Sequence, residues 1–209
     1  MKLFKITIIV AVLLLVTKAD AQVAPEIVLT WKAGSYAPPA YNGKVLPSEN
    51  SNVEIGLEML EAGKFANLSS VVIRWDVNNE LYRSGAGLKN ISLVIDRAKG
   101  DPIIAASFTY KGRPYDKRII IPVAKPDVSI TGGPDSFRAF LYFFNIASPA
   151  QAKFTWSANG IATEGQGERP DILNIDTDAP SGSALNISVR AQSLIRELEI
   201  ASRSITYTK

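Results

Sequence analysis

The sequence predicts an all-β protein made of two tandem β-sandwiches that follow an N-terminal signal peptide. Short runs rich in Val, Ile, Leu, Phe, Tyr and Thr are separated at close intervals by Gly, Pro, Asn, Asp and Ser, which is the pattern of sandwich strands. This pattern restarts after Pro122 and Pro126. The 209 residues, 46% of them apolar, provide enough chain for two domains with cores of their own.

The first 21 residues have the organisation of a secretory signal. Lys2 and Lys5 precede an uncharged apolar run over residues 6–16, and Ala19-Asp20-Ala21 supplies a small-x-small cleavage site. We therefore expect residues 1–21 to be removed and the chain to be exported to the periplasm, the cell surface or the extracellular space. The apolar run is about half of the roughly 20 residues that span a bilayer, so we expect no permanent membrane span after cleavage. Retention of the segment as an anchor stays an alternative.

Charge and composition narrow the classes of function. Removal of the signal takes away three lysines and one aspartate and lowers the formal net charge from +3 to +1. The remaining basic residues are dispersed among acidic ones, so we expect no nucleic-acid partner. The chain has no His and no Cys, which excludes a Ser-His-Asp triad, a Cys nucleophile, a Cys/His zinc site and any disulfide. We expect a protein that is not an enzyme.

Alternating segments predict the individual strands. Along the first of them, Ile27, Leu29 and Trp31 share one face. In the first half we expect strands over residues 27–31, 52–59, 71–77, 90–95, 103–110 and 117–123. In the second half we expect them over 128–131, 137–146, 153–158, 172–175, 184–191 and 200–208, with a short turn or bent strand at 194–200. The prolines between the halves predict domains 22–124 and 125–209, joined as a semi-rigid rod.

The two halves resemble each other internally. Trp75 and Trp156 are each followed three residues later by Asn, and Gly87 and Gly167 are each followed nine residues later by Asp. Such matches in the same order indicate a duplicated domain. Asn78-Asn79 and Asn159-Gly160 suit tight hairpins that need a positive φ, so we expect each Trp on the strand that enters its hairpin and inside a core.

This arrangement resembles the immunoglobulin-like and PKD-like β-sandwich modules of bacterial exported proteins. A Trp in the middle of a third strand, the hairpin after it, a Gly-x-Gly turn and two alternating strands carry the resemblance over residues 23–209. It implies seven or so strands per domain in two packed sheets, with the Trp buried between them. The chain lacks the two cysteines of antibody domains, and WDVNNE and WSANGI replace the PKD signature. The resemblance implies an architecture and no activity.

The candidate binding residues are Trp31, Tyr36 and Tyr41. The stretch AGSYAPPAYNGKVLP has no strand periodicity, and loops fixed by proline that present tyrosines are good contact surfaces. The alternative is that this connection wraps a sandwich edge and its rings close the end of a core. Stacking of the same three rings on a carbohydrate is a further alternative.

Acidic residues suggest a metal site and asparagines suggest glycosylation, and both signals are less specific than the aromatic loop. Ca²⁺ is one candidate, because five carboxylates lie close in sequence, at Glu164, Glu168, Asp171, Asp176 and Asp178. Their spacing is not that of an EF-hand or an RTX repeat, so we expect no bound cofactor or metal, with Ca²⁺ as the alternative. Three Asn-x-Ser tripeptides leave glycosylation open, at Asn67, Asn90 and Asn186.

Taken together, these features predict a non-enzymatic, exported structural or protein-interaction module of the cell envelope or surface, with a larger appendage as one setting. Its partner is expected to be a protein or a surface glycan. A carbohydrate-binding module that uses Trp31, Tyr36 and Tyr41 is the second hypothesis, and a glycosidase with two carboxylates across a cleft is the third.

Overall fold

The computed structural model describes residues 24–96, 100–175, 180 and 182–208. Over this part of the chain it is all-β apart from one 3₁₀ turn at Pro149–Gln151. The predicted signal peptide lies outside the described residues. None of the described helices is long and apolar enough to cross a membrane.

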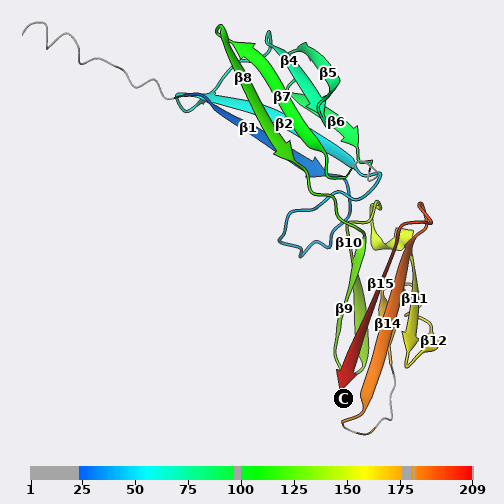
Figure 1. Cartoon of the computed structure of the whole chain (residues 1–209). Helices are drawn as coiled ribbons and strands as arrows, with labels where there is room; N and C mark the ends of the chain where they lie inside the picture. The colour runs from blue at the N-terminus through cyan, green and yellow to red at the C-terminus, as the bar shows by residue number, and fades with distance from the viewer. Residues whose placement is uncertain (1–23, 97–99, 176–179, 181, 209) are drawn as a thin grey trace, which may run out of the picture.

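The first sandwich consists of two antiparallel sheets (Figure 1). One sheet has the order β1-β2-β6, with the two-residue strand β3 beside the end of β2. The other has the order β5-β4-β7-β8. The strands are β1 (Glu26–Ala33), β2 (Asn52–Glu61), β3 (Lys64–Phe65), β4 (Val72–Val77), β5 (Glu80–Ala86), β6 (Asn90–Val94), β7 (Ile103–Tyr110) and β8 (Arg113–Ile120).

The second sandwich repeats this arrangement with sheets β9-β10-β13 and β12-β11-β14-β15. Its strands are β9 (Asp127–Gly132), β10 (Ser136–Tyr142), β11 (Ala152–Ala158), β12 (Ile161–Thr163), β13 (Ile172–Asn174), β14 (Ala184–Ser193) and β15 (Ile200–Thr208). With β3 set aside, the strand order within the sheets is the same in both halves. The internal repeat in the sequence therefore corresponds to a repeated topology, and the all-β sandwich prediction is confirmed.

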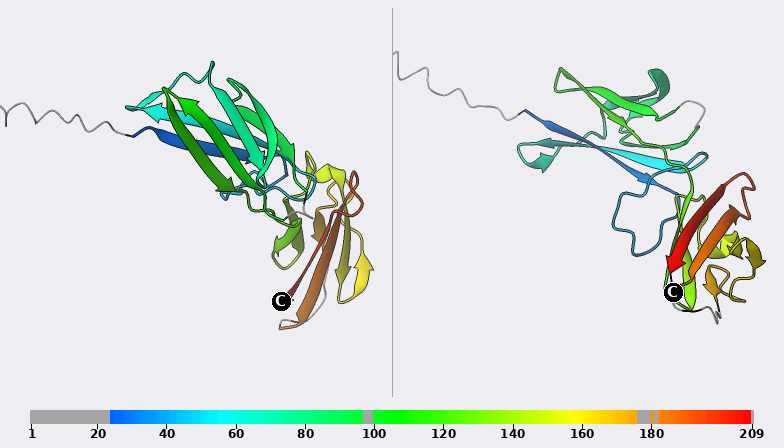
Figure 2. Two further views of the ribbon diagram at one scale, coloured as in Figure 1. Left: turned by 45° about the horizontal axis from the view of Figure 1, so that its top comes forward. Right: turned by 60° about the horizontal axis from the view of Figure 1, so that its bottom comes forward.

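Each sandwich encloses its own hydrophobic core. In β2, Val53, Ile55, Leu57 and Met59 alternate with exposed or half-buried residues and face β4 and β7. In β10 the corresponding residues include Phe137 and Leu141. Figure 2 shows the two sandwiches meeting end to end through a short connection. Because the two cores share no residue, their relative orientation depends on contacts outside the cores.

The two repeated tryptophans occupy equivalent places. Trp75 in β4 and Trp156 in β11 are 0% and 1% exposed, which confirms their prediction as core residues. The indole N–H of Trp75 donates to the carbonyl of Leu88 at 2.8 Å, and that of Trp156 donates to the carbonyl of Pro170 at 2.9 Å. Each ring thus fills its core, and its hydrogen bond fixes the connection that leads to β6 in the first sandwich and to β13 in the second.

The two repeated asparagines are equivalent as well. Asn78 and Asn159 have φ values of 54° and 51°, as the hairpin prediction requires. The side-chain oxygen of Asn78 accepts a hydrogen bond from the N–H of Ile103 at 2.9 Å, and that of Asn159 accepts one from the N–H of Asn186 at the same distance. The Trp-x-x-Asn unit therefore joins a hairpin to β7 in the first sandwich and to β14 in the second.

Some predicted strand limits are wrong for local backbone reasons. Strand β8 begins at Arg113 rather than at residue 117, because Lys111 and Gly112 form a tight hairpin at positive φ directly after β7. Strand β10 ends at Tyr142 rather than at residue 146, because Phe143 has a φ of 62°. Strands β5 and β12 were not predicted, since their exposed residues lack apolar alternation. The predicted turn at 194–200 is confirmed.

We expect Trp75→Phe and Trp156→Phe each to lower the free energy of unfolding of their own sandwich by about 2 kcal/mol, because each leaves a small cavity and a buried carbonyl without its donor. Chemical denaturation followed by far-ultraviolet circular dichroism measures this loss. Trp31→Phe is the control, since Trp31 is only half-buried and its indole ring lies at the edge of the core. If Trp31→Phe lowers the free energy of unfolding as much as the other two substitutions, the special contribution of the buried, hydrogen-bonded Trp75 and Trp156 is contradicted.

Candidate functional site at the junction of the two sandwiches

The linker between the sandwiches is short and tied to the first of them. It runs from the end of β8 at Ile120 to the start of β9 at Asp127. Within it, the N–H of Val123 donates to the Asp101 carboxylate at 2.9 Å, and the N–H of Ala124 donates to the Pro47 carbonyl at 2.8 Å. A linker that is restricted by two prolines and hydrogen-bonded in this way leaves the second sandwich little freedom.

A loop of the first sandwich reaches across the junction. This β1–β2 loop lies beside the start of the second sandwich in Figure 1. There the N–H of Tyr36 donates to the carbonyl of Phe144 at 2.7 Å, and the N–H of Phe143 donates to the carbonyl of Tyr36 at 2.7 Å. The two sandwiches are thus joined by an antiparallel β-bridge as well as by the linker.

Aromatic rings cover this bridge. Tyr41 makes edge-to-face contacts with Tyr142 and Phe143, with ring centroids 5.6 Å and 6.0 Å away. Tyr36 packs against the core of the second sandwich. The Tyr41 ring lies over Gly43, where a Cβ atom would come within 2.5 Å of it, so a larger residue at this position would displace the ring.

The polar half of the junction centres on the side chain of Asn145, which follows β10. Its amide nitrogen donates to the Glu49 carbonyl at 2.8 Å, the Ser48 hydroxyl at 3.1 Å and a carboxylate oxygen of Glu199 at 2.9 Å. Its amide oxygen accepts a hydrogen bond from the Ser51 hydroxyl at 2.7 Å. Since the Glu49 carbonyl and the Glu199 carboxylate only accept, they fix the orientation of the amide. One side chain therefore connects both sandwiches.

The serines of this network are almost fully buried. Ser48 and Ser51 are each 1% exposed, and the N–H of Ser48 donates to the Ser51 hydroxyl at 2.8 Å. Because the Ser51 proton points to Asn145, the Ser48 hydroxyl is the donor in the 3.2 Å contact between the two hydroxyls. Loss of the Asn145 side chain would remove the acceptor of the Ser51 hydroxyl and a donor to the Ser48 hydroxyl, and an unsatisfied buried hydroxyl costs about 1–3 kcal/mol.

Glu199 completes the network from the β14–β15 turn. Its Oε1 accepts hydrogen bonds from both the backbone N–H and the side chain of Asn145. Its Oε2 is buried and, within the described residues, has no hydrogen-bond partner. Burial raises the pKa of the Glu199 carboxyl, although hydrogen bonds from Asn145 and the charge of Arg196 oppose this. A groove of about 420 Å³ lies beside Glu199 and is lined by both sandwiches and the linker.

The three residues predicted to bind a partner are divided between the two sandwiches. Trp31 lies in β1, half-buried against the first core, with the Lys44 ammonium 4.2 Å from its ring centroid. Tyr36 and Tyr41 lie against the second sandwich instead. The structure thus brings Tyr36 and Tyr41 into the junction, whereas Trp31 packs on the first core, and Lys44 contacts both Trp31 and Tyr41. That these residues bind a partner stays a prediction.

The predicted calcium ligands are placed only in part. Asp176 and Asp178 lie outside the described residues, and Glu164 and Glu168 are exposed. Asp171 is buried and accepts hydrogen bonds from Arg138 at 3.0 Å and Arg169 at 3.1 Å. Burial alone would raise the pKa of Asp171, but the two guanidinium groups outweigh it and lower the pKa. No group of three acidic residues in the described part of the chain is arranged to hold a metal ion.

Sequence reasoning missed the polar network of the junction. Ser48 and Asn145 are 97 positions apart, and neither lies in a motif. The sequence signal for this region is the pair of linker prolines, Pro122 and Pro126. It predicts a junction between two domains but does not predict which residues make contact there. The Asn-x-Ser asparagines Asn67, Asn90 and Asn186 are all exposed.

Comparison with known proteins gives a distant structural likeness. No protein-family model and no curated protein matches the sequence. Among solved structures, the chain is similar to fibronectin(III)-like modules of Clostridium thermocellum CbhA, at 14% identity, over 87% of this chain and 93% of that chain, with a TM-score of 0.29. The sandwich fold therefore rests on the strand pairing and cores of this chain.

We expect the thermal midpoint of the chain to fall as the pH rises above the ordinary pKa of a glutamate, because burial raises the pKa of the Glu199 carboxyl and so disfavours its charged form in the folded chain. Glu199→Gln should remove this contribution to the decline. Calorimetry at stepped pH measures both effects. The chain has no His to add to this decline, and the lowered pKa values of Asp76 and Asp171 act in the opposite direction.

The matched control for this prediction is Glu197→Gln, which neutralises an exposed neighbour on the same turn. It should leave the pH dependence as it is. A decline that persists in Glu199→Gln would show that another group causes it.

Proposed function

We propose that the chain is a non-enzymatic module, exported to the cell envelope or surface, in which two sandwiches held at a fixed angle form a rigid spacer that presents interaction surfaces. The observation that carries this proposal is the Asn145 network, which couples the two sandwiches through directional hydrogen bonds, two of them to the buried residues Ser51 and Glu199. A flexible tether would need none of these contacts.

Several different contacts support a rigid joint between the two sandwiches. Domains that meet through a small polar surface move relative to each other by default. Here the short linker, the Tyr36 bridge and the buried serines restrain the same joint from different sides. Rotation about the linker would separate Tyr36 from Phe144 and would break the hydrogen bonds of Ser48 and Ser51 to Asn145, so the free energy rises away from one orientation.

Export and the absence of catalysis are supported by the sequence. The signal-like segment over residues 1–21 supports export, and the absence of His and Cys supports a role without chemistry. Without disulfides, each sandwich depends on its hydrophobic core, and each has a substantial one. A glycan-stacking platform receives no such support, because Tyr36 and Tyr41 pack against the second sandwich while Trp31 packs against the core of the first.

Distance measurements between paired spin labels test the spacer role. Because the chain has no cysteine, Lys117→Cys in β8 and Lys153→Cys in β11 place labels on exposed positions of the two sandwiches without side reactions. We expect a single narrow distance distribution by pulsed electron paramagnetic resonance. Adding Asn145→Ala should broaden it, since the network that fixes the joint is lost.

The control pair is Lys64→Cys with Lys117→Cys, both within the first sandwich. Its distribution should be narrow with and without Asn145→Ala. If the pair that spans the junction is much broader than this control in the otherwise unmodified chain, the rigid-spacer proposal is wrong.

A further inference from the structure

Strand β8 forms an open edge of the first sandwich. It runs over eight residues, Arg113–Ile120, and within the described part of the chain it pairs with β7 alone. Strand β1 lies beside it but belongs to the other sheet and pairs with β2. All residues of β8 are exposed except Tyr115 and Ile119, which are half-buried. A regular edge strand of this length is a template for a further strand.

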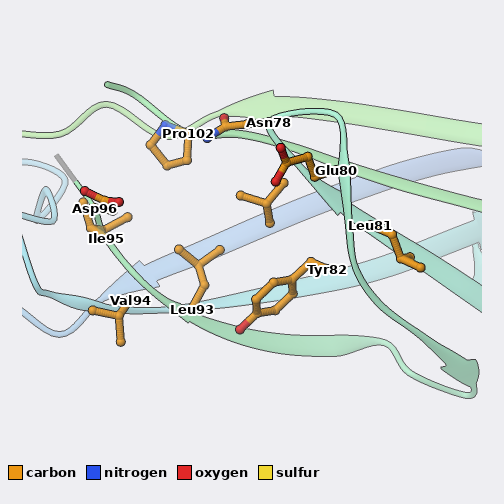
Figure 3. Close-up of a pocket in the computed structure, with 10 residues that line it drawn as sticks. Asn78, Glu80, Leu81, Tyr82, Leu93, Val94, Ile95, Asp96 and Pro102 are labelled. Atoms are coloured by element: carbon orange, nitrogen blue, oxygen red, sulfur yellow. The ribbon is translucent and has the colours of Figure 1, made fainter. Parts of the chain in front are cut away.

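The opposite edge of the same sheet is less regular. That edge is β5, where a β-bulge at Tyr82 interrupts the pairing with β4. The Tyr82 hydroxyl donates a hydrogen bond to the Ser92 carbonyl of β6, in the other sheet, at 2.5 Å. Figure 3 shows the Tyr82 side chain beside that of Leu93 in β6. Tyr82 therefore ties the two sheets together on this side of the sandwich, and β8 is left as the regular edge.

The backbone of β8 directs every second residue outward. The N–H of Ile121 donates to the Pro102 carbonyl at 3.1 Å, so Ile121 faces β7. Because these directions alternate along an antiparallel strand, the odd-numbered residues of β8 bond to β7. The residues whose backbone groups face outward are Pro114, Asp116, Arg118 and Ile120. Proline, which has no N–H, thus occupies an outward position, where no ladder bond to β7 is lost.

Two of the outward residues carry opposite charges that are not paired within the chain. Asp116 and Arg118 lie on the exposed face of the sheet, since the residues that alternate with them pack against the core. None of the ion pairs in the described residues includes either of them. A hydrogen bond from Arg74 lowers the pKa of the Asp76 carboxyl, and the charge of Arg118 adds to this from a distance. Both charges are thus available to a strand that is added at this edge.

These charges match a second copy of the same strand. If two β8 strands pair antiparallel with Lys117 opposite Lys117, Asp116 of each copy lies opposite Arg118 of the other. Opposite charges at facing positions stabilise a strand pair, and like charges destabilise it. Symmetric pairing centred on Asp116 or on Arg118 places that residue opposite itself and brings no opposite charges face to face. The register centred on Lys117 also has a like-charge pair at its centre, but it adds a facing ion pair on either side.

Backbone and apolar groups fit the same register. Asp116 and Arg118 of the other copy can exchange two backbone hydrogen bonds, because both residues face outward. Ile120, which is 62% exposed, lies opposite Pro114 of the other copy, and its N–H can donate to the Pro114 carbonyl. The missing N–H of Pro114 therefore costs a single bond at each end of the strand pair.

We propose that two copies of the chain form a twofold-symmetric dimer in which the β8 edges pair antiparallel about Lys117, with Asp116 of each copy facing Arg118 of the other. The free edge calls for a strand, and its self-complementary charges call for a second copy rather than an unrelated segment. Because the linker follows β8 and the strands are antiparallel, the second sandwiches lie at opposite ends of the dimer. This inference goes beyond the spacer role and does not depend on the junction.

Analytical ultracentrifugation of charge variants of the full chain tests the facing pairs. Asp116→Lys leaves basic residues on both sides of each pair, and Arg118→Glu leaves acidic residues. We expect each variant alone to dimerise about tenfold more weakly than the unmodified chain, a loss of about 1.4 kcal/mol. An equimolar mixture of the two variants should regain the original affinity, because each copy then supplies the charge that the other lacks.

Two further variants serve as rescue and control. Asp116→Arg combined with Arg118→Asp exchanges the charges within one chain, keeps the facing ion pairs and should dimerise like the unmodified chain. Glu54→Lys makes the same change of charge as Asp116→Lys on the exposed face of the other sheet and should leave the affinity unchanged. Thermal midpoints verify that each variant is folded.

Amide hydrogen exchange locates the interface on the chain. We expect exchange at the outward amides of Arg118 and Ile120 to slow as the concentration rises into the range where the dimer forms, because these N–H groups then join a ladder. Amides of β5, at the opposite edge of the sheet, should exchange at the same rate throughout.

Several outcomes would overturn the proposal. A chain that sediments as a monomer at every concentration would do so and would leave the edge to a partner of another kind. A dimer that neither charge variant weakens, a mixture that does not regain affinity, or a dimer without slower exchange at Arg118 would do so as well. Spin-labelled chain diluted in an excess of unlabelled chain reports the junction alone, so failure of the dimer and failure of the spacer role give different results.

Discussion

The rest of the molecule depends on the side-chain amide of Asn145. Two separate cores make two sandwiches, and apart from Tyr36, which packs against the second core, the residues of these cores do not set the angle between them. The amide does so because it meets acceptors and a donor that come from both sides: the Glu49 carbonyl and the Ser51 hydroxyl from the first sandwich, and the Glu199 carboxylate from the second. Buried hydrogen bonds of this kind are directional and expensive to leave unmade, so they specify one geometry even where the apolar contact is modest.

The same network includes a feature that does not favour stability. The Oε2 atom of Glu199 is buried without a hydrogen-bond partner in the described part of the chain, and burial raises the pKa of its carboxyl. Burial at the junction therefore disfavours the charged form of this carboxyl, which water would solvate better. The other carboxylate oxygen, Oε1, nevertheless accepts hydrogen bonds from the backbone N–H and the side-chain amide of Asn145. The second of these bonds orients the amide toward the first sandwich. Specificity of orientation and maximal stability are thus in opposition at this residue.

Much of the fold could be predicted from the sequence, because the repeated Trp-x-x-Asn unit is local. Trp75 and Trp156 sit in strands with clear alternation, and Asn78 and Asn159 need only a few neighbours to adopt a positive φ. Strands β5 and β12 escaped prediction because exposed edge strands carry no apolar periodicity. The junction escaped because serines, an asparagine and a glutamate from distant loops have no pattern until the chain is folded. The Tyr36–Tyr41 loop was identified as a contact surface, and within the chain it contacts the second sandwich.

Backbone ¹⁵N relaxation of the chain tests the central claim, a single rigid body, most directly, because it reports the tumbling of each sandwich separately. If the Asn145 network fixes the joint, amides of both sandwiches fit one anisotropic diffusion tensor with one overall correlation time, as expected for an end-to-end pair that rotates together. Two tensors, each with the shorter correlation time of a lone sandwich, would contradict the account and reduce the junction contacts to transient ones.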